Sequence, residues 1–321
     1  MKRRWKELIF AVILGFIVPS LIFMAVDKLD TPNQETVSTS DASTNPSTAL
    51  LISVLMDNGS VKDMELEHYI TCVVLKEMPA SFELEALKAQ AVVARTYTLR
   101  RFEKGSKHEE ADVCTNSACC QAFITPEDYI NSGCTQEQLN KVSTAVADTA
   151  GEVLHYDGKL IEATYFSCSG GQTEDAKAVW GAEIPYLKAT ESPGEEKATH
   201  YVDTVTFTLE EFGERLGAEL TGVPQNWIEE ITYTQGGGID TIYICGQAYK
   251  GTEMRKKLRL RSTAFAITVM GQSVTVTTKG YGHRVGMSQY GADAMAVSGK
   301  MYPEILSHYY QNVQLVTYTD N

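Results

Sequence analysis

The stretch LEHYITCVVLKE, residues 66–77, decides how the first part of the chain folds. Its apolar residues recur at intervals of three and four, which is typical of a helix with one face on a core; they are Leu66, Ile70, Val73 and Val74. Glu77 is the next position on the same face. Met78-Pro79 follows, and because a residue before proline avoids the α region, the sequence predicts that the helix ends there.

Glu77 combines an ionisable side chain with a position at the end of a core-facing row. Desolvation at such a position disfavours the charged carboxylate and raises the pKa of the group. A carboxyl group that stays protonated near neutral pH is what a general acid requires, so Glu77 is our candidate catalytic residue. The alternative is that Glu77 only extends its carboxylate into solvent at a helix end.

The N-terminal region has the pattern of a membrane anchor. Residues 8–26 are an apolar run without a charged side chain. At about 1.5 Å per residue, the run is roughly 28 Å long, enough to cross the hydrocarbon core of a bilayer. Four of residues 1–7 are Lys or Arg. Because the basic flank of a membrane span stays in the cytoplasm, this N-terminal tip is expected to be cytoplasmic. We expect an uncleaved transmembrane anchor, since no Ala-x-Ala cleavage pattern follows; a cleaved signal peptide is the alternative.

Composition divides the remainder of the chain into a linker and one domain. Residues 27–49 are rich in Ser, Thr, Asn, Asp and Pro and are expected to form a flexible linker. Residues 50–321 are then an extracytoplasmic domain. The formal net charge of −13 makes the surface a poor match for nucleic acid phosphates, so we expect no nucleic acid partner.

Helix and strand patterns alternate irregularly within this domain. Asn58-Gly59 and Asp157-Gly158 are hairpin signals, and Ser81 and Ser288 are candidate helix caps. Strands are predicted at 50–55, 61–64, 153–156, 159–164, 230–233, 241–244, 265–270, 273–278 and 314–318, and helices at 66–77, 81–101, 136–149, 209–216 and 253–260 and from residues 288 and 302. Without a regular βαβ alternation, the expected fold class is α+β, with mixed helices and antiparallel strand pairs.

An irregular segment, residues 103–135, carries a candidate metal site. His108, Cys114, Cys119 and Cys120 have the spacing His-x5-Cys-x4-Cys-Cys, and thiolates with an imidazole favour Zn²⁺. Because two adjacent cysteines reach one metal only with an unusual backbone, the pattern favours the other three residues over Cys119. The chain has seven cysteines, an odd number; the alternative is structural thiols with a disulfide to Cys134.

Residues 165–173, YFSCSGGQT, combine a strand end with two glycines, which let a backbone approach a ligand closely. Ser169 and Gln172 can hydrogen-bond ligand hydroxyl groups, and Cys168 is a candidate nucleophile if a distant histidine activates it. The alternative is a sharp strand exit without a functional role.

A second glycine-rich segment, residues 281–292, reads YGHRVGMSQYGA. It predicts a tight turn into a helix capped by Ser288. His283 and Gln289 are candidate polar groups at a cleft. The segment lacks the Lys-Ser/Thr pair of a phosphate-binding loop.

Taken in order, several stretches resemble the stage II sporulation protein D family; they are residues 77–79, 86–97, 167–171, 260–263, 280–292 and 302–310. Members of that family look like lytic transglycosylases that degrade peptidoglycan during engulfment in spore-forming bacteria. The resemblance covers essentially the whole extracytoplasmic domain. It implies a glycan-binding cleft, and a location in the engulfing mother-cell membrane with the catalytic domain outside.

The resemblance assigns roles to particular residues. It implies that Glu77 is the catalytic acid. Some members of the family resemble zinc proteins with the pattern His-x5-Cys-x4-His-Cys. In this chain, Cys119 stands where that pattern has a histidine. The Zn²⁺ is expected to order a loop near Glu77 rather than to activate water. For glycan contacts we predict Arg95, Ser169, His283 and Gln289.

The expected substrate is a peptidoglycan glycan strand, stripped of its peptides as the family suggests, with a sporulation amidase and an integral membrane scaffold as partners. The expected reaction cleaves the bond between N-acetylmuramic acid (MurNAc) and N-acetylglucosamine (GlcNAc) and leaves a 1,6-anhydro end. Three alternatives stay open: a muramidase-type hydrolase, which would need a second carboxylate; a non-catalytic glycan-binding module that enhances a wall amidase; and a peptidase built on Cys168 and His283.

Overall fold

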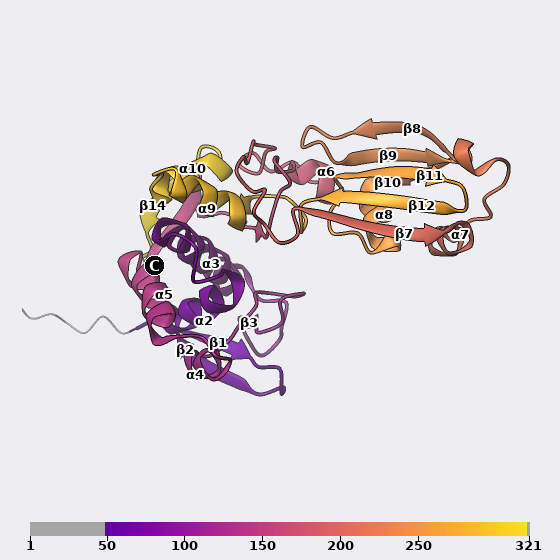
Figure 1. Cartoon of the computed structure of the whole chain (residues 1–321). Coiled ribbons are helices and arrows are strands. Elements are labelled where there is room, and N and C mark those ends of the chain that lie inside the picture. Colours follow the sequence, from indigo (N-terminus) through magenta and orange to yellow (C-terminus); the bar gives the residue numbers. More distant parts are fainter. Residues whose placement is uncertain (1–48, 320–321) are drawn as a thin grey trace, which may run out of the picture. The chain divides into compact units, whose positions relative to one another are not determined.

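The structure is a computed structural model that describes residues 49–319, and these residues belong to one compact unit (Figure 1). The predicted anchor, residues 8–26, lies outside the described residues, as does nearly all of the predicted linker. Within 49–319, every helix is too short or too polar to cross a bilayer.

The unit begins with a small sheet and a group of helices. β1 (Leu51–Leu55) pairs antiparallel with β2 (Val61–Glu65) and parallel with the short β3 (Val113–Cys114). The helices of this part are α2 (Leu66–Glu77), α3 (Leu84–Lys104), α4 (Pro126–Asn131) and α5 (Gln136–Asp148). Figure 1 shows α2, α3 and α5 packed side by side, in agreement with the hydrophobic core that their residues share.

The predicted bounds of the first helix are confirmed. α2 ends at Glu77, and Met78 has the extended backbone expected before Pro79. The prediction that Ser81 caps the next helix is wrong, because α3 begins only at Leu84. The intervening residues form a turn in which the Phe82 N–H bonds the Pro79 carbonyl, so the helix starts one turn later.

The middle of the chain builds strands that share a second hydrophobic core. β7 (Val202–Thr208), β12 (Ser273–Lys279) and β11 (Phe265–Met270) form one antiparallel sheet, and β8 (Ile228–Tyr233), β9 (Ile239–Ile244) and β10 (Gln247–Lys250) form another. Three helices complete this part: α7 (Leu209–Leu216), η1 (Pro224–Asn226) and α8 (Gly251–Leu258). The sequence did not predict β7 or β10.

Short pairings connect distant parts of the chain near the first core. β6 (Tyr165–Phe166) and β13 (Met287–Ser288) pair in parallel, which brings the two glycine-rich segments together. The remaining elements are β4 (Glu152–Tyr156), β5 (Lys159–Leu160), α6 (Ala176–Trp180), α9 (Gln289–Val297), α10 (Tyr302–Tyr309) and β14 (Gln314–Thr317). Ser288 caps α9 as predicted, accepting a hydrogen bond from the Gly291 N–H. Helices mixed with antiparallel strands confirm the α+β class.

Candidate active site

Glu77 is the last residue of α2 and is half-buried. Its Oε1 accepts a hydrogen bond of 2.7 Å from the backbone N–H of Ala122. Burial is the largest influence on the carboxyl group and raises its pKa, while the Ala122 N–H, the Tyr165 hydroxyl and the Gln289 amide counteract it in part. The Gln289 Nε2 makes no hydrogen bond of regular geometry within the described residues. The net direction favours the protonated acid.

Glu77 lies where two cavities meet. One cavity has a volume of about 380 Å³ and is also lined by Tyr165 and His283. The other has a volume of about 550 Å³ and runs along Pro79 and the turn after it. Glu77, Ser167 and Gln289 line both cavities. An extended ligand therefore has room on each side of the Glu77 carboxyl group.

The number of carboxyl groups in the walls of the two cavities restricts the reactions that the site can catalyse. Among residues 49–319, Glu77 is the only carboxylate that lines either cavity. Hydrolysis of a glycoside normally uses a second carboxyl group, about 5–9.5 Å from the first, as nucleophile or base. The walls around Glu77 offer polar groups of other kinds, such as the Tyr165 hydroxyl, the His283 imidazole and the Gln289 amide.

Hydrogen bonds of a buried side chain position the backbone segment that contacts Glu77. Gln121 is buried; its Nε2 donates to the Thr98 hydroxyl (3.0 Å), and its Oε1 accepts from the Tyr165 hydroxyl (3.1 Å). These bonds tie the segment before Ala122 to α3 and to β6. The N–H that contacts Glu77 is thus positioned by elements far apart in the sequence.

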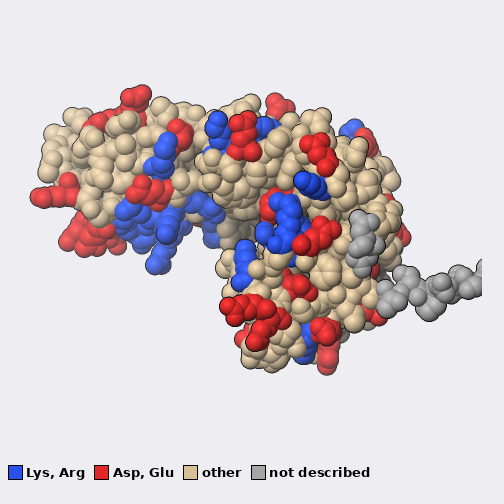
Figure 2. All heavy atoms as spheres, turned by 180° about the vertical axis from the view of Figure 1, so that it is seen from behind, with Lys and Arg blue, Asp and Glu red and all other residues tan. Residues whose placement is uncertain are grey.

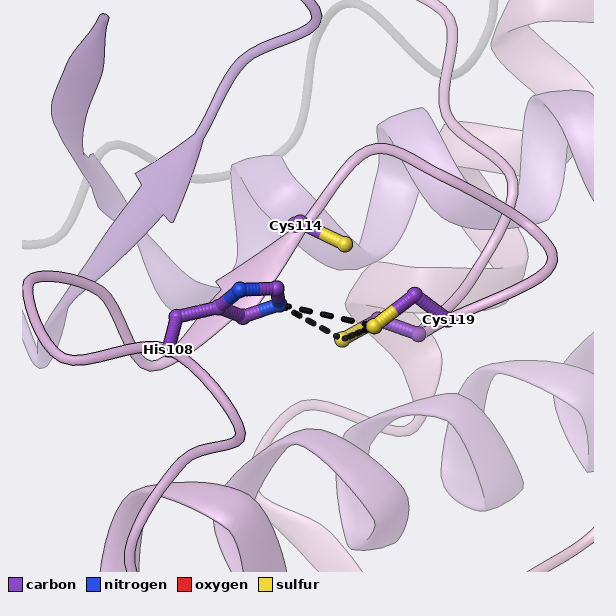
Figure 3. Close-up of side chains that lie close together, drawn as sticks. His108, Cys114 and Cys119 are labelled. Carbon is purple, nitrogen blue, oxygen red and sulfur yellow. Dashed lines mark hydrogen bonds between the residues drawn. The ribbon is translucent and has the colours of Figure 1, made fainter. Parts of the chain in front are cut away.

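The candidate metal ligands lie together in the loop around β3 (Figure 3). The Nε2 of His108 is 3.6 Å from the Cys119 Sγ and 3.7 Å from the Cys120 Sγ, and the two Sγ atoms are 4.0 Å apart. With Cys114, all four ligand atoms lie within 4.8 Å of one another. Tetrahedral zinc, with Zn–S bonds of about 2.3 Å and Zn–N bonds of about 2.0–2.1 Å, separates its ligand atoms by about 3.6–3.8 Å. The residues present fit zinc.

The backbone places Cys119 in the cluster on the same footing as its neighbours, contrary to the expected difficulty for adjacent cysteines. The Asn116 carbonyl accepts hydrogen bonds from the N–H groups of both Cys119 and Cys120, which makes a tight turn. This turn allows both thiols to face His108. The alternative of a disulfide to Cys134 is also wrong, since Cys134 is a free cysteine.

The loop that holds the cluster continues directly into the segment beside Glu77. Cys120 lines the smaller cavity, and Ala122, whose N–H contacts the Glu77 carboxyl group, is two residues further along. A metal held by Cys119 and Cys120 would therefore fix the position of that N–H.

Two of the four residues predicted to contact glycan lie in a cavity with Glu77, and two do not. His283 and Gln289 line the smaller cavity with Glu77. Arg95 is fully buried and bonds the Glu67 carboxylate at 2.6 and 2.8 Å. Ser169 is also buried and donates to Glu195 Oε2 at 2.7 Å. Because internal carboxylates occupy both side chains, we leave Arg95 and Ser169 out of the proposed contacts.

The Arg95–Glu67 pair predicts a stability effect. In the Glu67→Gln variant, the guanidinium stays buried without its counter-charge, so the free energy of unfolding should fall by about 2–3 kcal/mol. Urea unfolding measures this change. The exposed Glu103→Gln is the matched control and should change stability by less than about 0.5 kcal/mol. A Glu67→Gln protein as stable as the control would contradict this interpretation of Arg95.

The thiol peptidase alternative finds no support in the geometry. Burial raises the pKa of Cys168 to about 12, whereas a nucleophilic cysteine needs a lowered pKa. The Cys168 Sγ faces Glu195 at 3.4 Å. Desolvation and Arg255 lower the pKa of His283 to about 4, so its imidazole is neutral, and its Nδ1 accepts a hydrogen bond from the Val285 N–H.

Sequence reasoning missed several residues around Glu77. Tyr165 and Ser167 belong to the first glycine-rich segment, whose strand end could have drawn attention to them. Ala122 carried no signal, because it contacts Glu77 through its backbone.

Comparisons with known proteins show the family of this chain. A family model described as stage II sporulation protein matches residues 57–156, which include Glu77 and the His/Cys cluster. The chain is 41% identical over 263 residues to stage II sporulation protein D of Bacillus amyloliquefaciens and to that of Bacillus subtilis, covering 80% of this chain and 76% of each relative. It is 29% identical over 300 residues to an amidase enhancer of Bacillus subtilis, covering 77% of this chain and 40% of that protein. The chain belongs to the stage II sporulation protein D family.

Proposed function

We propose that this protein is a membrane-anchored lytic transglycosylase that cleaves MurNAc–GlcNAc bonds of peptidoglycan during sporulation engulfment. One observation carries the proposal: a single desolvated carboxyl group lies where two cavities meet. A reaction with an intramolecular nucleophile needs only one carboxyl group for acid and base work. The open cavities on both sides suit a polymer that continues past the cleaved bond.

The proposed reaction has two proton transfers. Protonated Glu77 gives its proton to the glycosidic oxygen as the bond between that oxygen and MurNAc C1 breaks. The resulting carboxylate then takes the proton of the MurNAc O6 hydroxyl as O6 bonds to C1. The products are a GlcNAc end with a free hydroxyl and a 1,6-anhydro-MurNAc end, and Glu77 is protonated again.

The neighbours of Glu77 support this cycle. The Ala122 N–H, the Tyr165 hydroxyl and the Gln289 amide favour the carboxylate, which limits how far burial raises the pKa of Glu77. Glu77 must both lose and regain its proton, so a pKa that burial raises and these hydrogen bonds lower suits the cycle. In the same cavity, neutral His283 can hydrogen-bond the glycan.

Zn²⁺ is the proposed resident metal, held by His108, Cys114, Cys119 and Cys120. Four protein ligands close a tetrahedral zinc site and leave no open position for substrate, so the chemistry that zinc supplies here is structural. Its contribution is the order of the loop that carries the Ala122 N–H.

The proposed setting is the outer side of the engulfing mother-cell membrane. Residues 8–26 would anchor the chain with its N-terminus in the cytoplasm, and residues 27–49 would let residues 50–321 reach the wall. Peptide-stripped glycan strands, a sporulation amidase and an integral membrane scaffold are the proposed partners. The likeness to an amidase enhancer supports a role beside an amidase.

Product analysis tests the proposal. Full-length protein should release saccharides with 1,6-anhydro-MurNAc ends from peptide-stripped glycan strands, as identified by mass spectrometry. Saccharides with reducing MurNAc ends would instead indicate a hydrolase. Glycan binding with faster amidase turnover and no saccharide release would indicate a non-catalytic enhancer, and either result would overturn the proposal.

The raised pKa of Glu77 predicts a pH dependence. The acid must be protonated when the leaving oxygen departs, so kcat/KM should fall as pH rises through the pKa of Glu77. Because burial raises that pKa, the alkaline limb should lie above the ordinary range for glutamate, about 4.3. A pH profile of saccharide release checks this. A limb at the ordinary glutamate value would contradict the desolvated acid.

A further inference from the structure

A short basic segment stands out in this acidic chain. Five of the residues 255–261 are Lys or Arg, whereas the formal net charge of the chain is −13. Figure 2 shows Lys and Arg side chains gathered over α8. Two of these cations have internal partners: Lys257 donates to the Leu216 carbonyl at 2.7 Å, and Arg261 lies 3.5 Å from the Asp203 carboxylate.

Arg255 differs from these neighbours. Its side chain is half-buried, yet within the described part of the chain its guanidinium makes no hydrogen bond and no ion pair. Burial also lowers its pKa, which indicates a desolvated cation. A partly desolvated charge without a counter-charge is unfavourable in the free protein, and an anionic ligand would relieve that cost.

The surroundings of Arg255 place it beside the cavity of Glu77. The charge of Arg255 acts on His283 and on Tyr281, and both residues line the smaller cavity. Its neighbour Arg261 stacks over the Tyr281 ring at 4.7 Å and accepts the Gly282 N–H at its carbonyl. The segment that carries Arg255 is therefore tied to the wall of that cavity.

The aromatic residues around His283 suit a sugar ring. Phe166 lies 5.6 Å and Trp180 5.4 Å from the His283 ring, measured between ring centroids. Trp180 is 43% exposed at the end of α6. Amphipathic sugars pack on such faces, so a ring bound there would carry its substituents close to the basic segment.

One substituent of the proposed substrate gains a negative charge when an amidase removes the stem peptide. MurNAc carries a lactyl ether whose carboxyl group is an uncharged amide while the stem peptide is attached, and a free carboxylate once an amidase has removed the peptide. A guanidinium binds a carboxylate through two parallel hydrogen bonds, and it gains nothing comparable from an amide.

We propose, on the basis of the proposed function, that Arg255 binds the lactyl carboxylate of peptide-stripped MurNAc and makes the site selective for stripped strands. The competing source of a carboxylate is the stem peptide itself. We favour the lactyl group because it is attached directly to the sugar ring, whereas the carboxylates of the stem peptide lie several bonds further from the ring.

Binding to three matched ligands tests the proposal. The full-length chain with Glu77→Gln keeps the ligand intact, and calorimetry gives Kd for stripped glycan oligosaccharides, for the same oligosaccharides with lactyl methylamides, and for strands with intact stem peptides. The stripped ligand should bind tightest. Adding Arg255→Gln should raise Kd for the stripped ligand by about 10- to 100-fold and leave Kd for the other two ligands unchanged. Arg255→Lys should keep part of the affinity for the stripped ligand.

Lys256→Gln is the matched control, since it removes the same charge from the next, exposed residue and should change Kd by less than about threefold. Three results would overturn the proposal: equal binding of the stripped and methylamide ligands, equal weakening of all ligands by Arg255→Gln, or tightest binding of peptide-bearing strands that depends on Arg255. These results do not depend on the product. Reducing ends instead of anhydro ends would overturn the proposed reaction while leaving the Arg255 preference intact.

Discussion

Glu77→Gln should lower the release of anhydro-MurNAc saccharides by at least about 10²- to 10⁴-fold, the usual contribution of a positioned general acid or base. The substitution keeps the shape of the side chain and removes its proton chemistry. Since Oε1 of Glu77 accepts the Ala122 N–H, an amide oxygen can take over that contact, and the fold should be preserved. Quantified saccharides from stripped glycan strands give the rate.

Glu103→Gln is the control for this variant, because Glu103 is an exposed acid on α3 and is not among the residues that line either cavity. It should cleave at the wild-type rate. Circular dichroism and thermal midpoints should be alike for both variants and the wild type. A Glu77→Gln protein that cleaves as fast as wild type would remove the basis of the proposed reaction.

Loss of the metal should have the second largest effect. Cys119→Ser removes one of the four ligands, so bound zinc should fall from about one equivalent to less than about 0.2. If the site contributes a few kcal/mol to this loop, the thermal midpoint should drop by roughly 5–10 °C. Cleavage should fall with it, because the turn made by Cys119 and Cys120 positions the N–H that contacts Glu77.

Cys245→Ser is the control for the thiol change, since Cys245 is free and lies outside both the cluster and the walls of the two cavities. This variant should keep its zinc, its thermal midpoint and its activity. Elemental analysis and activity are measured on the same samples, with zinc returned to chelated wild-type protein to restore cleavage. Wild-type protein that is fully active without zinc would exclude the proposed structural role.

The sequence was most informative where local spacing determines the structure. The periodicity of residues 66–77 identified α2, its end before Pro79 and the position of Glu77 on the core-facing row. The His/Cys cluster was recognisable from ligand types and spacing. The placement of Cys119 beside His108 was not, because it depends on a turn closed by the Asn116 carbonyl.

Sequence reasoning failed where a tertiary partner decides the role of a polar residue. Arg95 and Ser169 were predicted as glycan contacts, yet each bonds a carboxylate more than twenty residues away in the sequence, Glu67 and Glu195. The pairing of β6 with β13 likewise joins segments more than a hundred residues apart and could not be seen in either segment alone. The anchor at residues 8–26 stays a prediction.

The origin of the new sugar end tests the central claim most directly. Wild-type full-length protein should digest stripped glycan strands in water enriched in heavy oxygen, and mass spectrometry should read the MurNAc ends. The account predicts anhydro ends that carry no heavy oxygen, because O6 of the same sugar closes on C1. Newly formed reducing ends in place of anhydro ends would mean that water is the nucleophile, and would contradict an acid that works alone.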